Sequence, residues 1–82
     1  MFDILYSGQA LKQLEKLEKS ITERILKTIE RIRIRPVPHV KKLVSSPYFR
    51  LRVGDYRVIL DIKHDKLIIM VIEVGHRKNV YG

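Results

Sequence analysis

Residues 48–53 and 56–63 largely alternate apolar and polar side chains, and Gly54-Asp55 separates the two runs. A period of two places successive side chains on opposite faces of a β-strand, and Gly-Asp between two such runs is typical of a two-residue turn. The pattern therefore predicts a β-hairpin. Because an odd-length turn would carry charged side chains into the core, we expect Arg52 to lie directly opposite Arg57.

Four segments have the apolar or alternating character of strands: residues 2–6, 48–53, 56–63 and 66–74. Ser7-Gly8 ends the first of them, and Gly75 is expected to close the last. A second short turn at His64-Asp65 would join the last three strands into an antiparallel meander.

Two helices are predicted between the first strand and the meander. Residues 9–19 carry alanine and leucine side chains at three- and four-residue spacing, which gives one apolar face. Ser20-Ile21-Thr22-Glu23 has the form of a capping box, so a second helix is expected to begin at Ser20. Pro36 should end that helix, and residues 36–47, which hold all three prolines, are interpreted as a basic connecting loop.

The order of these elements predicts an α+β fold, in which an N-terminal strand and a helical hairpin pack on an antiparallel β-meander sheet. At this length two separate cores could not form, so we expect residues 1–82 to be a single domain. The two helices would cover one face of the sheet and leave the other face open.

The chain has a formal net charge of +8, which favours binding to polyanions such as nucleic acid. Charge alone does not separate DNA, RNA, an acidic protein and a membrane surface. The absence of cysteine excludes disulfides and thiolate zinc sites, and the three histidines are far apart, so we expect no metal and no cofactor. The longest apolar run, residues 67–72, is too short to cross a bilayer, and the first residues do not resemble a secretion signal. We therefore expect a cytoplasmic protein without membrane association.

Alternation places Arg50, Arg52 and Arg57 together on the open face of the predicted sheet. Like charges directly opposite each other cost about 0.2–1 kcal/mol, so such a cluster needs a reason. The arginines could spread into water, or Asp61 could neutralise one of them; alternatively, they form a site for phosphate, whose oxygens match the guanidinium fork. We expect Glu73 to form an ion pair with Arg57, and general-base work is the alternative.

Two stretches, residues 48–59 and 71–81, resemble the RelE/ParE superfamily of toxins from prokaryotic toxin–antitoxin systems. The resemblance covers nearly the whole chain, and the two C-terminal stretches carry most of it. It implies a ribosome-dependent endoribonuclease, an mRNA interferase that cleaves messenger RNA in the ribosomal A site by metal-free attack of the 2′-hydroxyl. It also implies three partners, which are the ribosome, the mRNA and a RelB-like antitoxin that holds the toxin inactive.

The family's functional residues transfer to this chain one by one. The basic pair on the second strand of the family falls on Arg50 and Arg52, the arginine of the next strand on Arg57, the arginine after the final strand on Arg77, and the tyrosine near the end on Tyr81. The resemblance thus implies that Arg57 and Arg77 stabilise charge on the phosphate and that Tyr81 transfers protons. RNA contacts are assigned to further basic residues of these segments and of the basic loop before them: Arg50, Arg52, Lys41, Lys42, His76 and Lys78.

This chain departs from the family pattern at Arg50 and Arg52, where well-known members carry lysine. Lysine can release a proton and arginine effectively cannot, which disfavours a general-base role for Arg50 and Arg52. Two other functions stay open. The ParE branch shares the fold and inhibits DNA gyrase but generally lacks the terminal arginine and tyrosine, and a basic nucleic-acid-binding module would need no catalysis.

Overall fold

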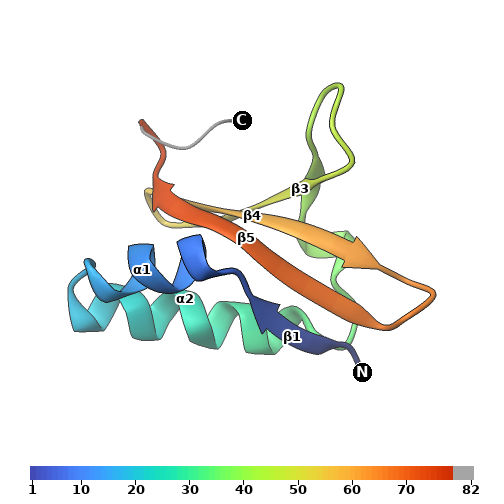
Figure 1. Ribbon diagram of the computed structural model, residues 1–82, viewed down its shortest axis with the longest axis horizontal. Coiled ribbons are helices and arrows are strands. Elements are labelled where there is room, and N and C mark those ends of the chain that lie inside the picture. The colour runs from blue at the N-terminus through green and yellow to red at the C-terminus, as the bar shows by residue number, and fades with distance from the viewer. Residues whose placement is uncertain (79–82) are drawn as a thin grey trace.

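A computed structural model of the chain describes residues 1–78 (Figure 1). In chain order its elements are β1 (Asp3–Tyr6), α1 (Gly8–Glu15), α2 (Lys19–Ile32), the 3-10 helix η1 (Val37–His39), β2 (Lys41–Lys42), β3 (Phe49–Val53), β4 (Tyr56–Lys63) and β5 (Ile68–His76). No helix in this part of the chain is long and apolar enough to span a membrane.

The strands form one five-stranded sheet in the order β1-β5-β4-β3-β2. The antiparallel meander β3-β4-β5 is confirmed, as is the hairpin register, in which Arg52 faces Arg57 across a turn whose Gly54 has a φ of 58°. The N-terminal strand joins the same sheet beside β5, and these two strands run parallel, so the sheet is mixed. The predicted α+β fold is therefore correct, and the parallel edge is an addition to it.

Several predicted boundaries need correction. Gly75 does not close the last strand, because β5 continues to His76 and the N–H of Arg77 still donates to the Asp55 carbonyl at 2.9 Å. The turn before β5 covers residues 64–67. The stretch from 36 to 47, predicted to be a loop, contains η1 and the two-residue edge strand β2.

The helices begin and end at other residues than predicted. The capping box at Ser20 is wrong: α2 begins at Lys19, because the Glu18 carbonyl already accepts the N–H groups of Ile21 and Thr22. Pro36 does not end this helix either. It stops at Ile32, where Arg33 is held by its Nε–H donating to the Phe2 carbonyl at 2.9 Å and by an ion pair with Glu30 at 2.8 Å.

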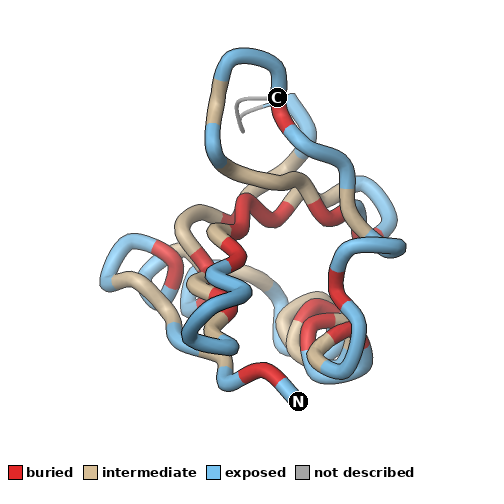
Figure 2. Tube along the Cα trace, turned by 90° about the vertical axis from the view of Figure 1, so that its right-hand side faces the viewer, coloured by how far each residue is buried: buried red, intermediate tan, exposed pale blue. Residues whose placement is uncertain are grey.

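A single apolar layer joins the helices to one face of the sheet (Figures 1 and 2). From α2, Ile25, Ile29 and Ile32 recur at helical spacing and are buried against alternate residues of β4 and β5. Burial of each such aliphatic side chain contributes about 1.5–3 kcal/mol relative to its exposure. The helices thus cover one face as predicted, and the other face is open except where the β2–β3 connection packs on Ile59.

Strand β5 carries a bulge, because the register to β4 shifts between Ile59 and Leu60. Beyond the end of β1, side chains of α1 and its N-cap form hydrogen bonds with backbone groups of β5. Ser7 Oγ, which caps α1, donates to the Ile72 carbonyl at 2.7 Å, and Gln13 Oε1 accepts the N–H of Val74 at 2.6 Å. These side chains satisfy backbone groups that would otherwise lie unpaired in the sheet.

Candidate nucleic-acid interface

The open face carries the three predicted arginines in one area. Arg52 and Arg57 are register partners, and Arg50 lies two residues before Arg52 on the same side of β3. Lys41 of β2 pairs with Arg50 and extends the basic area toward the sheet edge. Lys42 pairs with Phe49, so alternation places it on the other side of β2, where it is exposed.

No acidic side chain of residues 1–78 forms a salt bridge with Arg52 or Arg57. Within residues 1–78 the salt bridges join Arg33 to Asp3 and to Glu30, and Lys63 to Asp61. Asp61 therefore pairs with Lys63, at 3.1 Å, and not with an arginine. The expected ion pair between Glu73 and Arg57 is wrong: the two residues lie diagonally on neighbouring strands, and no salt bridge of residues 1–78 joins them.

A small second core supports one side of the open face. Leu43 and Ile59 are buried together, and Tyr48 and Ile72 pack against them. Figure 1 shows the β2–β3 connection standing above the sheet on the side away from the helices. The connection is thus fixed to the open face and rises beside the arginines.

The hairpin turn anchors both an arginine and the start of the C-terminal tail. Arg52 Nε–H donates to the Gly54 carbonyl at 3.4 Å, and the N–H of Arg77 donates to the Asp55 carbonyl. The backbone of Arg77 is therefore brought to the end of the sheet where Arg52 and Arg57 lie. Exposed Lys78 follows it.

Two further tail residues, His76 and Tyr81, were predicted to belong to the site. His76 lies opposite Tyr56, on the face that the helices cover, and the two rings meet edge to face at 5.5 Å. Its Nδ1 accepts the N–H of Lys78 at 3.3 Å, so its assigned RNA contact would have to be made from the edge of the helical layer. Tyr81 lies outside the described residues.

Sequence analysis did not identify Arg24 as a candidate site residue. Its guanidinium lies against the hairpin turn, and a Cβ placed on Gly54 would be 3.0 Å from its Nη1. No local pattern reveals a contact between a helix and a turn that are 30 residues apart in the chain. Among residues 1–78 no three histidine or carboxylate side chains converge in a way that could hold a metal ion.

Comparisons with known proteins agree with this architecture. A family model described as the ParE toxin of the type II toxin–antitoxin system parDE matches residues 4–81. The mRNA interferase toxin RelE of Escherichia coli K12 is 28% identical over 76 residues, which is 89% of this chain and 80% of that protein. A chain of the archaeal RelE–RelB complex from Pyrococcus horikoshii OT3 is 27% identical, with a TM-score of 0.82 over 96% of this chain and 98% of that one. A chain of the RelBE2 toxin–antitoxin complex from Mycobacterium tuberculosis has the same fold, with a TM-score of 0.86 at 22% identity over 93% of this chain and 98% of that one.

Proposed function

This chain belongs to the ParE toxin family of type II toxin–antitoxin systems and is a RelE-type toxin; from that premise we propose that it is an endoribonuclease that cleaves messenger RNA in the ribosomal A site. The observation that carries the proposal is the gathering of Arg52, Arg57 and the Arg77 backbone at one end of the open face. The similarity to a protein named mRNA interferase supports it. The reaction would take place in the cytoplasm, where ribosomes and their messengers meet.

The proposed chemistry is an internal phosphoryl transfer. The ribose 2′-oxygen forms a bond to the neighbouring phosphorus, and the bond from phosphorus to the 5′-oxygen breaks. A proton leaves the 2′-hydroxyl, and a proton arrives on the departing 5′-oxygen. The products are a 2′,3′-cyclic phosphate, which can open to a 3′-phosphate, and a 5′-hydroxyl.

Each residue of the site has a distinct proposed role. Arg57 and Arg77 stabilise the charge that develops on the phosphate oxygens, which preformed cationic donors do without reorganisation. Arg50 and Arg52 position the RNA strand, because guanidinium stays protonated and cannot act as a base. Tyr81 transfers protons.

The proposed natural inhibitor is a RelB-like antitoxin, as in the RelE–RelB complex of similar fold. Such a partner would act by covering the arginines of the open face or by displacing the tail from the hairpin turn. Its binding energy would also stabilise the toxin by mass action.

Cleavage on purified ribosomes programmed with a defined messenger tests the proposal. We expect a cut in the A-site codon with a 5′-hydroxyl on the downstream product, and no cut when the ribose at that position is 2′-deoxy. A 5′-phosphate product, or cleavage of the deoxy substrate, would exclude the mechanism. The family model that matches is described as ParE, so inhibition of DNA gyrase supercoiling should be assayed in parallel with the same preparation. Gyrase inhibition without RNA cleavage would replace the proposal.

A further inference from the structure

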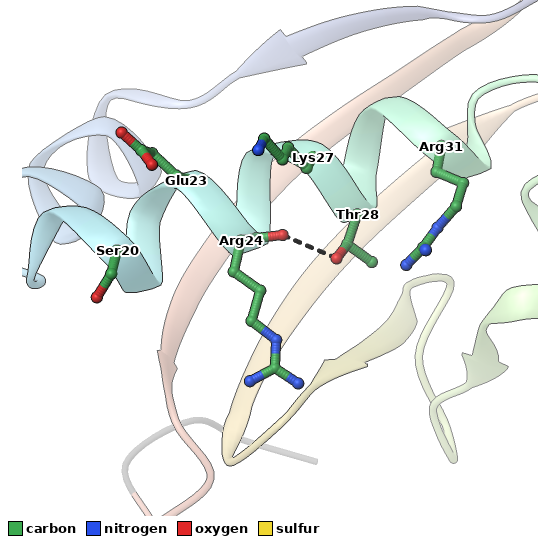
Figure 3. A pocket seen from close by; sticks show the side chains of 6 residues that line it. All are labelled: Ser20, Glu23, Arg24, Lys27, Thr28 and Arg31. Carbon is green, nitrogen blue, oxygen red and sulfur yellow. Dashed lines mark hydrogen bonds between the residues drawn. The ribbon is translucent and has the colours of Figure 1, made fainter.

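Helix α2 presents a second basic surface, on the side of the helix away from the core. Six of its residues line an open groove of about 440 Å³: Ser20, Glu23, Arg24, Lys27, Thr28 and Arg31. They recur at three- and four-residue spacing and form one stripe along the helix. We call these residues the α2 stripe. Figure 3 shows Ser20, Arg24 and Arg31 extending from the same side of the helix.

The cations of the α2 stripe are available for a ligand. None of Arg24, Lys27 and Arg31 takes part in a salt bridge within residues 1–78. Glu23 is the one acidic residue lining the groove, and in Figure 3 its carboxylate points away from the Arg24 guanidinium. Arg31 follows Arg24 by seven positions of helix, a rise of about 10.5 Å, so the stripe can meet several phosphates at once.

The α2 stripe is continuous with the arginines of the open face. Arg24 Nη1 lies against one side of the hairpin turn, 3.0 Å from the position of a Cβ on Gly54. Arg52 Nε–H donates to the carbonyl of the same glycine at 3.4 Å. Two guanidinium groups from different layers therefore contact one turn, and the basic surface runs around the end of the hairpin.

The polar and charged lining of the groove favours a phosphate-bearing ligand over a protein helix. All six residues are polar or charged, whereas a docked protein helix needs apolar pockets for its anchoring side chains. An apolar groove of about 330 Å³ does exist elsewhere, where Phe2, Ile34 and Val37 contribute to the lining. The α2 stripe instead offers guanidinium and ammonium donors and the Ser20 hydroxyl, which suit phosphate oxygens, while the Thr28 hydroxyl donates to the Arg24 carbonyl at 2.8 Å.

We propose that the α2 stripe binds the phosphate backbone of a folded, double-helical RNA, at a place separate from the strand that is cut. This inference rests on the proposed function, because RNA is chosen over DNA from the proposed substrate of the adjoining face. Recognition would be of shape and charge rather than sequence, as is usual for A-form duplexes.

The test measures binding of a short mixed-sequence RNA duplex to the purified toxin as a function of salt, by fluorescence anisotropy. The variant Arg24→Ala/Lys27→Ala/Arg31→Ala removes the cations of the stripe. The matched control, Lys12→Ala/Arg35→Ala/Lys66→Ala, removes the same charge from exposed positions outside it. Replacing the three cations of the α2 stripe should make the slope of log binding constant against log salt concentration shallower by about 2–3, since each phosphate contact contributes about 0.7–0.9. The slope of the control variant should stay near that of the parent protein.

Equal weakening of both variants would overturn the proposal, since it would indicate general charge attraction. Loss of affinity for an acidic antitoxin peptide but not for the duplex would also overturn it and would identify a protein-binding surface. Because Arg24 touches the hairpin turn, Lys27→Glu/Arg31→Glu provides a second variant that leaves this contact in place. Ribosomal cleavage by the parent protein is scored separately: a parent that cleaves messenger while the stripe variant binds the duplex normally would refute the α2 stripe alone.

Discussion

Replacing Arg57 by glutamine should make the protein more stable and less active at the same time. Glutamine keeps most of the aliphatic stem and removes the positive charge that lies directly opposite Arg52. Relief of a like-charge pair across a sheet is worth about 0.2–1 kcal/mol. For a domain of this size that corresponds to a rise in Tm of about 1–8 °C. Loss of a donor to the developing phosphate charge should lower the cleavage rate by about 10²–10³-fold.

Thermal melting and single-turnover cleavage on ribosomes measure the two effects on one preparation. Arg33→Gln is the matched control, because Arg33 donates to the Phe2 carbonyl and pairs with Glu30. Each lost hydrogen bond should cost this control about 0.5–1.5 kcal/mol and leave cleavage unchanged. If Arg57→Gln melted below the parent as Arg33→Gln does, Arg57 would be a structural residue and its assignment to the phosphate would fail.

Three further predictions concern Gln13, Tyr6 and Tyr81. Gln13→Leu removes the acceptor of the Val74 N–H and should lower the free energy of unfolding by about 1–3 kcal/mol in denaturant titrations, and an unchanged midpoint would contradict the role of α1 at this edge. Burial, and to a lesser degree Glu30, raises the pKa of Tyr6 above its ordinary 10.0, so stability should fall as pH rises above that value toward the folded-state pKa. Tyr6→Phe should remove this part of the alkaline loss, and parallel curves for variant and parent would contradict it. Tyr81→Phe should lower the cleavage rate by about 10²–10⁴-fold while Glu73→Gln stays within a few-fold of the parent, and the reverse order would assign proton transfer to Glu73.

The hairpin and its arginine face could be predicted because their information is local. Alternation on both sides of Gly54-Asp55 determines which side chains share a face, and an even turn then aligns Arg52 with Arg57. The grouping of these arginines needed no knowledge of the helices.

Long-range pairing explains most of what the sequence did not reveal. The parallel alignment of β1 with β5 joins residues more than 60 positions apart. The bulge lies at the end of the apolar run of residues 67–72, where no turn residue marks the extra position at Ile72. The helix start was misplaced because the Glu18 carbonyl begins the hydrogen-bond ladder, so Ser20 lies within α2 as part of the groove.

The way in which the edges of the sheet are covered affects whether copies of the protein aggregate at high concentration. A long unpaired strand is a template on which another molecule can add its own strand, and polymers can grow from it. Here β2 presents two lysines on one margin. The other margin is the four-residue strand β1, beyond whose end Ser7 and Gln13 occupy backbone groups of β5. Short length, charge and helix cover are the means by which natural sheets avoid such growth. The chain can thus expose the arginine-bearing part of a sheet face to a ligand while giving its own copies little backbone on which to assemble.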